Sequence, residues 1–183
     1  ENIRKVIAEV QAGTDQTICA DSTGVEITGI ITVSGGGAWT TTGSGNFNPD
    51  TFSLTFTYEP SLSDISDSTV VLTLTTTDNG LCNPVSDNVN IFITPAPTVF
   101  AGLDRTVCAD ADSVTLNGSV TIATGGQWTS LGGVGTGTFT KSTSLSTSFI
   151  LGTADITNKF VDLVLTTTGS GQCNEIMDTI RIL

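Results

Sequence analysis

The chain has 183 residues, of which 38% are hydrophobic and only 13% are charged. So high an apolar fraction with so little charge excludes a disordered chain, and the length suits one ordinary domain or two small ones. Six Lys and Arg against 18 Asp and Glu give a net charge of −12, which argues against nucleic acid or anionic membrane surfaces as partners because like charges repel.

The chain repeats itself. The motif AGTDQTICA at 12–20 returns as AGLDRTVCA at 101–109, an offset of 89 that also relates Trp39 to Trp128. Further along, the offset becomes 91, and LTLTTT at 72–77 matches LVLTTT at 163–168. Between the copies lies TPAPTV at 94–99, whose prolines favour an extended connector. The repeat therefore predicts two domains, 1–94 and 95–183.

Each repeat is expected to be all-β, because apolar residues alternate at period two in a background rich in Thr and Val. In the first copy this pattern predicts one strand over 25–33, others around 54–58 and 70–75, and a last strand through 89–93. No helical period stands out. About seven short strands per repeat are typical of an immunoglobulin-like sandwich, in which Trp39 and Trp128 are expected to be core residues.

The residues give little support to catalysis. The chain has no histidine, which excludes a Ser-His-Asp or Cys-His centre. Two carboxylate pairs, Asp64 with Asp67 and Asp110 with Asp112, could in principle hydrolyse glycosides. Neither pair lies in an aromatic context, so we interpret them as solvated turn residues and expect no enzymatic activity. The sequence likewise has no run of apolar residues long enough to span a membrane.

A calcium site is the one cofactor that the acidic residues suggest. Asp15 and Asp104 recur just after the start of each repeat, and Asp78 lies near the far hairpin. Carboxylates of this kind hold Ca²⁺ in secreted proteins, but no D-x-D-x-D run is present. The alternative is that the recurring Asp caps backbone groups in the AGxD turn, and otherwise no cofactor or metal is expected.

The ordered series AGLDRTVCADADSVTLNGSV, GGQW and VDLVLTTT resembles the PKD-like, immunoglobulin-like repeats of giant cell-surface adhesins of the Bacteroidetes, in particular those that serve gliding motility. The resemblance covers nearly the whole chain, once per repeat. It implies an extracellular, cell-surface location and a filamentous multi-repeat adhesin without enzymatic activity in its repeats. It carries over no ligand-binding residue.

Four regularly spaced cysteines indicate an oxidised, secreted protein. One pairing joins Cys19 to Cys82 and Cys108 to Cys173 within the repeats. In a sandwich, however, the two cysteines of a repeat are expected at opposite ends, about 30 Å apart. We therefore favour a bridge between repeats, Cys19 to Cys173. The other two cysteines would then pair with further repeats of a longer array, as the early end of the last strand at Ile182-Leu183 also suggests.

These observations predict a structural or adhesive repeat segment of a large surface adhesin, with neighbouring repeats and surface polysaccharide or the substratum as partners. The alternative is a carbohydrate-binding or accessory module of a secreted enzyme. Fold alone does not choose between the two.

Overall fold

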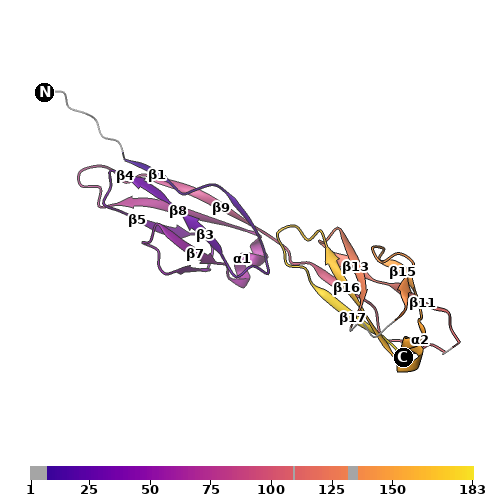
Figure 1. Cartoon of the computed structure of the whole chain (residues 1–183). Coiled ribbons are helices and arrows are strands. Elements are labelled where there is room, and N and C mark those ends of the chain that lie inside the picture. The colour runs from indigo at the N-terminus through magenta and orange to yellow at the C-terminus, as the bar shows by residue number, and fades with distance from the viewer. Residues whose placement is uncertain (1–7, 109, 132–135) are drawn as a thin grey trace. The chain divides into compact units, whose positions relative to one another are not determined.

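The computed structural model describes residues 8–108, 110–131 and 136–183. The chain divides into two compact units, Glu1–Pro95 and Ala96–Leu183. In each unit, nearly all of the regular secondary structure is β-strand (Figure 1), and the prediction of two tandem β-sandwich domains is confirmed. Among the described residues, no helix combines the length and the apolar character that crossing a membrane requires.

In the first unit, two sheets form the sandwich, with strand orders β2-β9-β8-β5 and β3-β7-β6, and a separate pair β1-β4 completes it. All pairings are antiparallel except β2 with β9, which run parallel. The elements are β1 (Glu9–Gln11), β2 (Gln16–Cys19), β3 (Val25–Thr28), β4 (Ile30–Thr32), β5 (Gly36–Thr41), β6 (Asn46–Asn48), β7 (Thr55–Glu59), α1 (Leu62–Asp67), β8 (Thr69–Thr77) and β9 (Ser86–Thr94).

The second unit repeats this plan with sheets β13-β16-β17 and β11-β15-β14 and the pair β10-β12. In the place of β2 it has a single parallel bridge from Arg105 to Ile182. The elements are β10 (Thr98–Phe100), β11 (Ser113–Asn117), β12 (Ser119–Thr121), β13 (Gly125–Ser130), β14 (Thr138–Phe139), β15 (Ser146–Ile150), α2 (Thr153–Asn158), β16 (Val161–Thr168) and β17 (Met177–Ile182).

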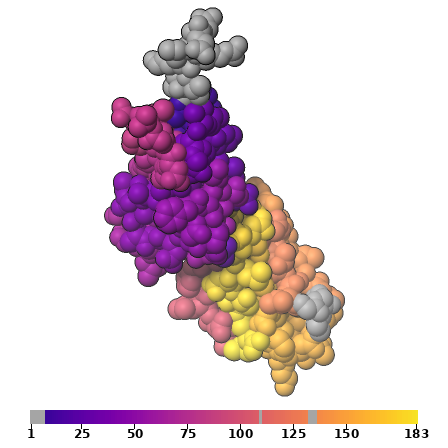
Figure 2. Space-filling model, turned by 90° about the vertical axis from the view of Figure 1, so that its left-hand side faces the viewer, coloured from indigo at the N-terminus to yellow at the C-terminus, as the bar shows by residue number. Residues whose placement is uncertain are grey.

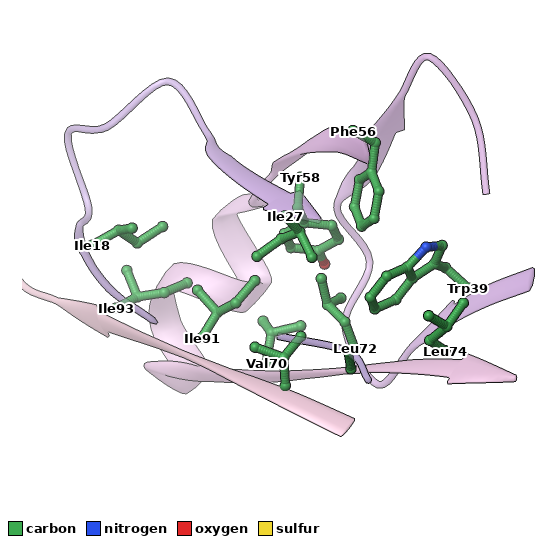
Figure 3. Close-up of a cluster of buried hydrophobic side chains, with 12 residues drawn as sticks. Ile18, Ile27, Trp39, Phe56, Tyr58, Val70, Leu72, Leu74, Ile91 and Ile93 are labelled. Atoms are coloured by element: carbon green, nitrogen blue, oxygen red, sulfur yellow. The ribbon is translucent and has the colours of Figure 1, made fainter. Parts of the chain in front are cut away.

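The alternation of apolar residues along the strands determines which side chains form the core of each unit. On β8, Val70, Leu72 and Leu74 are at most 1% exposed, whereas the residues between them are half-buried. Side chains from both sheets meet there, and Trp39 packs edge-on against Phe56 with ring centroids 5.0 Å apart (Figure 3). Alternation alone therefore specifies which face of each strand is buried.

The strand expected over 25–33 is in fact two strands, and that prediction is wrong. It breaks at Gly29, so that β3 pairs with β7 while β4 pairs with β1. A Cβ atom on Gly29 would lie 2.5 Å from Cδ2 of Leu74 and 2.7 Å from the Trp39 ring. The glycine therefore gives the core tryptophan the space it needs at the point where the chain changes sheets.

The expectation that the chain lacks helices is also wrong, because α1 and α2 each contain six residues. A helix this short has too few turns to show an apolar period. The signal that could have revealed α1 is Ser61 three residues before Asp64, a capping box in which each side chain accepts a hydrogen bond from the other residue's backbone N–H.

Unusual backbone conformations recur at the same offsets as the sequence motifs. Positive φ angles are found at Val33 (74°) and Ile122 (65°), and at Ser68 (62°) and Lys159 (64°). Apart from Asn or Asp, residues with side chains rarely adopt such angles, and β-branched residues least of all. Their repetition shows that the two units share backbone geometry in detail, and not only the strand order.

Candidate functional site

The recurring aspartates connect the start of each unit to its last strand. In the first unit, Asp15 Oδ1 accepts hydrogen bonds from the backbone N–H of Asn90 at 2.9 Å and from its side-chain amide at 3.0 Å. A second carboxylate, on the last strand, binds the start of the unit: Asp87 Oδ2 accepts a hydrogen bond from the N–H of Ala12 at 2.8 Å. These carboxylates satisfy backbone donors beside β9, where the AGxD motif passes the strand.

The second unit reproduces both contacts. Asp104 Oδ1 accepts from the N–H of Arg181 at 2.8 Å, and Asp178 Oδ2 accepts from the N–H of Ala101 at 2.8 Å. The partner residues differ, but in both units the donor is a backbone group, which every residue except proline offers. The motif is therefore explained by a hydrogen bond to the backbone in each unit.

The calcium candidates are not brought together. Asp15 lies beside β9, whereas Asp78 lies in the turn after β8 with a φ of 54°, and Asp104 belongs to the other unit. Within either unit taken alone, the described residues form no group of three or more Cys, Asp or Glu side chains close enough to share an ion. The backbone-capping alternative accounts for Asp15 and Asp104, although the capped donors lie on the last strand and not in the AGxD turn.

Asp64 is the most buried carboxylate of the first unit, at 1% exposure. Its Oδ1 accepts from the N–H of Ser44 at 2.9 Å, and its Oδ2 accepts from the Tyr58 hydroxyl at 2.8 Å and from the N–H of Ser61 at 3.0 Å. Burial by itself would raise the pKa of Asp64, but these donors together hold it below its usual value of 3.8. Burial and the neighbouring carboxylate raise the pKa of Tyr58.

The equivalent carboxylate of the second unit, Asp155, is in a different environment. It is 4% exposed, and its Oδ2 accepts from the N–H of Gly152 at 2.8 Å. Phe149 stands where the first unit has Tyr58, so no hydroxyl is offered, and Asp155 Oδ1 has no hydrogen-bond partner among the described residues. Sequence comparison of the two copies could have detected this exchange of Tyr for Phe.

The pair of Asp64 and Asp67 does not form a catalytic arrangement, and the interpretation of Asp64 as a solvated turn residue is wrong, because it is buried in α1. Asp64 is buried and fully engaged in local hydrogen bonds, while Asp67 is exposed at the end of α1. Asp110 and Asp112 are both exposed. A general acid and base need access to the same substrate bond, which a buried, saturated carboxylate does not have.

The aromatic residues that could stack on a sugar are mostly internal. Trp39 and Trp128 are 2% and 1% exposed and belong to the two cores. A polar hollow of about 230 Å³ in the first unit, bordered by Gly13, Gln16 and Glu26, has no aromatic residue in its wall. Sugar-binding sites usually combine polar groups with an exposed ring, so this hollow lacks half of that chemistry.

The cysteines of each unit lie at opposite ends of its last strand. Cys19 is paired in register with Thr94 at the end of β9, whereas Cys82 lies in the hairpin before β9 begins at Ser86. Nine residues at about 3.3 Å each separate these ends by roughly 30 Å, far beyond the reach of a disulfide. Cys82 and Cys108 are free and exposed, so the alternative pairing within repeats is wrong.

No family model matches the chain, and no curated protein matches it. Among solved structures, the chain is similar to titin domains I67–I69, with a TM-score of 0.50 and 7% identity over 96% of this chain and 64% of that one. It is also similar to Drosophila N-cadherin EC1-4 (TM-score 0.47, 14% identity, 97% and 49% covered) and to the D00-D0 domain of intimin (0.47, 10%, 97% and 100%).

The chain spans between about half and two thirds of the length of the cadherin and titin structures that it matches. At 7% identity, the titin match shows the fold and nothing about activity. The chain is thus a tandem of immunoglobulin-like β-sandwiches, as the strand order of each unit also indicates.

Proposed function

We propose that the two units are tandem repeats of an extracellular surface adhesin, and that they act as a stiff spacer clamped by a disulfide between Cys19 and Cys173. The observation that carries this proposal is the position of the cysteines at opposite ends of each unit. A repeat whose cysteines cannot reach each other can form disulfides only with another repeat or another molecule.

Three further features support a structural role. The motifs that recur in sequence have structural explanations, since they supply core residues, capping carboxylates and turns. The acidic surface favours solubility of a long extracellular chain. Of the two carboxylate pairs that could have formed a catalytic centre, the first contains the buried Asp64, which already accepts three local hydrogen bonds. In this interpretation Cys82 and Cys108 are the equivalents of Cys173 and Cys19, and each bonds to a neighbouring repeat of the array.

The resemblance to gliding-motility adhesins of the Bacteroidetes extends the proposal. A clamped array would hold a distal contact site away from the cell and transmit traction to it. Weak contacts of many repeats with polysaccharide or substratum would add up to firm attachment, because linked sites act at high effective concentration.

Peptide mapping without reduction tests the clamp directly. We expect one disulfide-linked peptide pair containing Cys19 and Cys173, with Cys82 and Cys108 recovered as thiols. Small-angle scattering of the oxidised and reduced chain then measures the mechanical effect, which we expect to be a narrower range of inter-unit distances when oxidised. The double variant C82S/C108S is the matched control and should behave as the parent chain. Recovery of a Cys19–Cys82 peptide would overturn the proposal.

A glycan array separates the spacer from the carbohydrate-binding module. A spacer is expected to give no saturable binding to any one glycan at micromolar concentration. Saturable binding that competes with a soluble sugar would instead favour the module, and its site could be sought at the hollow beside Gln16 and Glu26.

A further inference from the structure

A hairpin of the first unit, residues 78–85, joins β8 to β9 and carries the pair Asn79-Gly80. The space-filling view shows this hairpin, in magenta, projecting from the surface of its unit (Figure 2). Asparagine followed by glycine is prone to deamidation, because no Cβ atom hinders attack of the glycine nitrogen on the side-chain amide. A second pair of this kind, Asn117-Gly118, lies at the end of β11. The two pairs differ in their surroundings, so we expect them to differ in reactivity.

The backbone nitrogen of Gly80 is available for this reaction. Gly80 is exposed and has a φ of 61°, and a Cβ atom built on it would meet no heavy atom within 4 Å. Among the described residues, its N–H has no hydrogen-bond partner. No backbone hydrogen bond therefore has to break before this nitrogen can lose its proton to solvent.

The side chain of Asn79 is held by a hydrogen bond that deamidation removes. Its amide nitrogen donates to the carbonyl of Thr76 at 3.0 Å, whereas its Oδ1 is buried without a partner among the described residues. In the second unit the equivalent residue is Ser170, whose hydroxyl donates to Oγ1 of Thr167 at 3.2 Å. The second hairpin therefore has an anchor of the same kind, but no amide to lose.

The pair Asn117-Gly118 is protected, although the side chain of Asn117 is exposed. The N–H of Gly118 donates to the carbonyl of Leu145 at 2.9 Å. Asn117 Oδ1 accepts a hydrogen bond from the hydroxyl of Ser146 at 2.8 Å, and the same two residues are paired in register between β11 and β15. Because the attacking nitrogen is engaged, this pair can react only after the strands separate locally.

We propose that Asn79 is a site of spontaneous deamidation in the folded chain and that Asn117 is not. The deprotonated nitrogen of Gly80 forms a bond to Cγ of Asn79, and the side-chain nitrogen leaves as ammonia, which gives a succinimide. Water then opens either carbonyl of this ring and yields aspartate or isoaspartate.

The reaction changes the hairpin. Its product adds one negative charge to a chain that already carries −12. A carboxylate cannot donate to the carbonyl of Thr76, so the hairpin that carries Cys82 loosens as the protein ages. The inference goes beyond the proposed spacer role and does not depend on any disulfide.

The test ages the 183-residue chain in reducing buffer at physiological temperature and mildly alkaline pH. Peptide mapping by mass spectrometry follows the conversion of amide to acid at both sites. We expect Asn79 to convert at least about tenfold faster than Asn117, because local opening limits the second site. In denaturant, where both pairs are exposed, the two rates should become similar. Equal rates in the folded chain, or faster conversion of Asn117, would overturn the proposal.

Two variants complete the design. N79S places the residue of the second hairpin in the first and should accumulate no acidic product in this hairpin. Acidic species that grow as fast in N79S as in the parent would place the reaction elsewhere and overturn the proposal. N79D reproduces the aspartate product, and we expect its amides at Cys82 and Val85 to exchange faster, while those of 70–74 stay unchanged. Unaltered exchange in N79D would contradict the loosening of the hairpin.

Discussion

The hydroxyl of Tyr58 donates a 2.8 Å hydrogen bond to Oδ2 of Asp64, and both residues are buried in the first unit. The bond joins β7 to the first turn of α1, whose N-cap Ser61 also binds Asp64. One carboxylate thereby fixes the helix to the sandwich, so its protonation state is coupled to folding.

Tyr58 is the only tyrosine in the chain, which allows its titration to be read directly from the ultraviolet absorbance of tyrosinate. Burial, reinforced by Asp64, raises the pKa of Tyr58 above 10.0. We expect a titration midpoint above 10.0 in the folded chain, and a lower midpoint in D64N because the neighbouring negative charge is gone. A group with a raised pKa contributes stability below its unfolded pKa and loses it as the pH rises through the folded value. A midpoint at or below 10.0 in the folded parent would contradict this account.

The loss of folding stability at acidic pH is predicted from Asp64. Although burial opposes ionisation, the donors around this carboxylate hold its pKa below 3.8. With the folded pKa depressed, its stabilisation is present above about 3.8 and is lost as the pH falls through the lower folded value. We therefore expect the Tm of the parent to exceed that of D64N at neutral pH, and the two Tm values to converge at strongly acidic pH. A difference between the two chains that stays constant down to the lowest pH would show that the charge of Asp64 is not responsible.

The second unit offers the reciprocal experiment. Among the described residues, Asp155 Oδ2 accepts one hydrogen bond, from the N–H of Gly152, and Phe149 occupies the position of Tyr58. We expect F149Y to stabilise the second unit by about 1 kcal/mol, because the new hydroxyl would donate to Asp155 Oδ2 as the hydroxyl of Tyr58 donates to Asp64 Oδ2. Hydrogen exchange of β15 and α2 amides would assign the gain to this unit.

The matched control is Y58F, which makes the first unit resemble the second. Removing a donor to a buried carboxylate should destabilise that unit by about 1–3 kcal/mol. Destabilisation by both F149Y and Y58F would contradict this account. It would show that the second unit lacks the room for a hydroxyl that the first unit provides beside its carboxylate.

Much of this fold could be predicted from the sequence because its signals are local and repeated. Alternation on β8 specifies its buried face, and the offset between Trp39 and Trp128 defines the repeat. The break at Gly29 could not be predicted in the same way, since the pattern of alternation continues across it. It depends on a contact with Leu74 and the Trp39 ring, which are distant in sequence.

The candidate site shows a similar limit. That Asp15 recurs as Asp104 is visible in the sequence, but its partner is a backbone amide on the last strand, about 75 residues away. A backbone donor leaves no signature in residue type, because Asn90 in one unit is Arg181 in the other. The capping role therefore had to be seen in three dimensions.

This role gives a prediction that also tests calcium. D15A should destabilise the first unit by about 1 kcal/mol, because two hydrogen bonds to Asn90 are lost. Exchange of the Asn90 amide should accelerate. Millimolar Ca²⁺ or a chelator should leave the Tm of the parent unchanged, since Asp15 serves the backbone. D67A, which changes an exposed carboxylate, is the control. A Tm increase with Ca²⁺ that D15A abolishes would instead establish a metal site.

The last prediction concerns Val33. Its positive φ favours glycine, although the residue carries a β-branched side chain. Its φ of 74° is unfavourable for a β-branched residue, and its side chain is 58% exposed. Glycine adopts this conformation without the Cβ clash, so V33G should stabilise the first unit by about 1 kcal/mol despite the greater flexibility of the unfolded chain.

The neighbouring Ile30 provides the contrast that makes this test sharp. It is equally exposed, at 56%, but lies within β4 in ordinary strand conformation. I30G should therefore destabilise the unit by about 0.5–1 kcal/mol. Denaturant unfolding of V33G and I30G should shift the midpoint in opposite directions, and I122G in the second unit should follow V33G. Destabilisation by both V33G and I30G would mean that the side chain of Val33 stabilises the turn by more than its backbone strain costs.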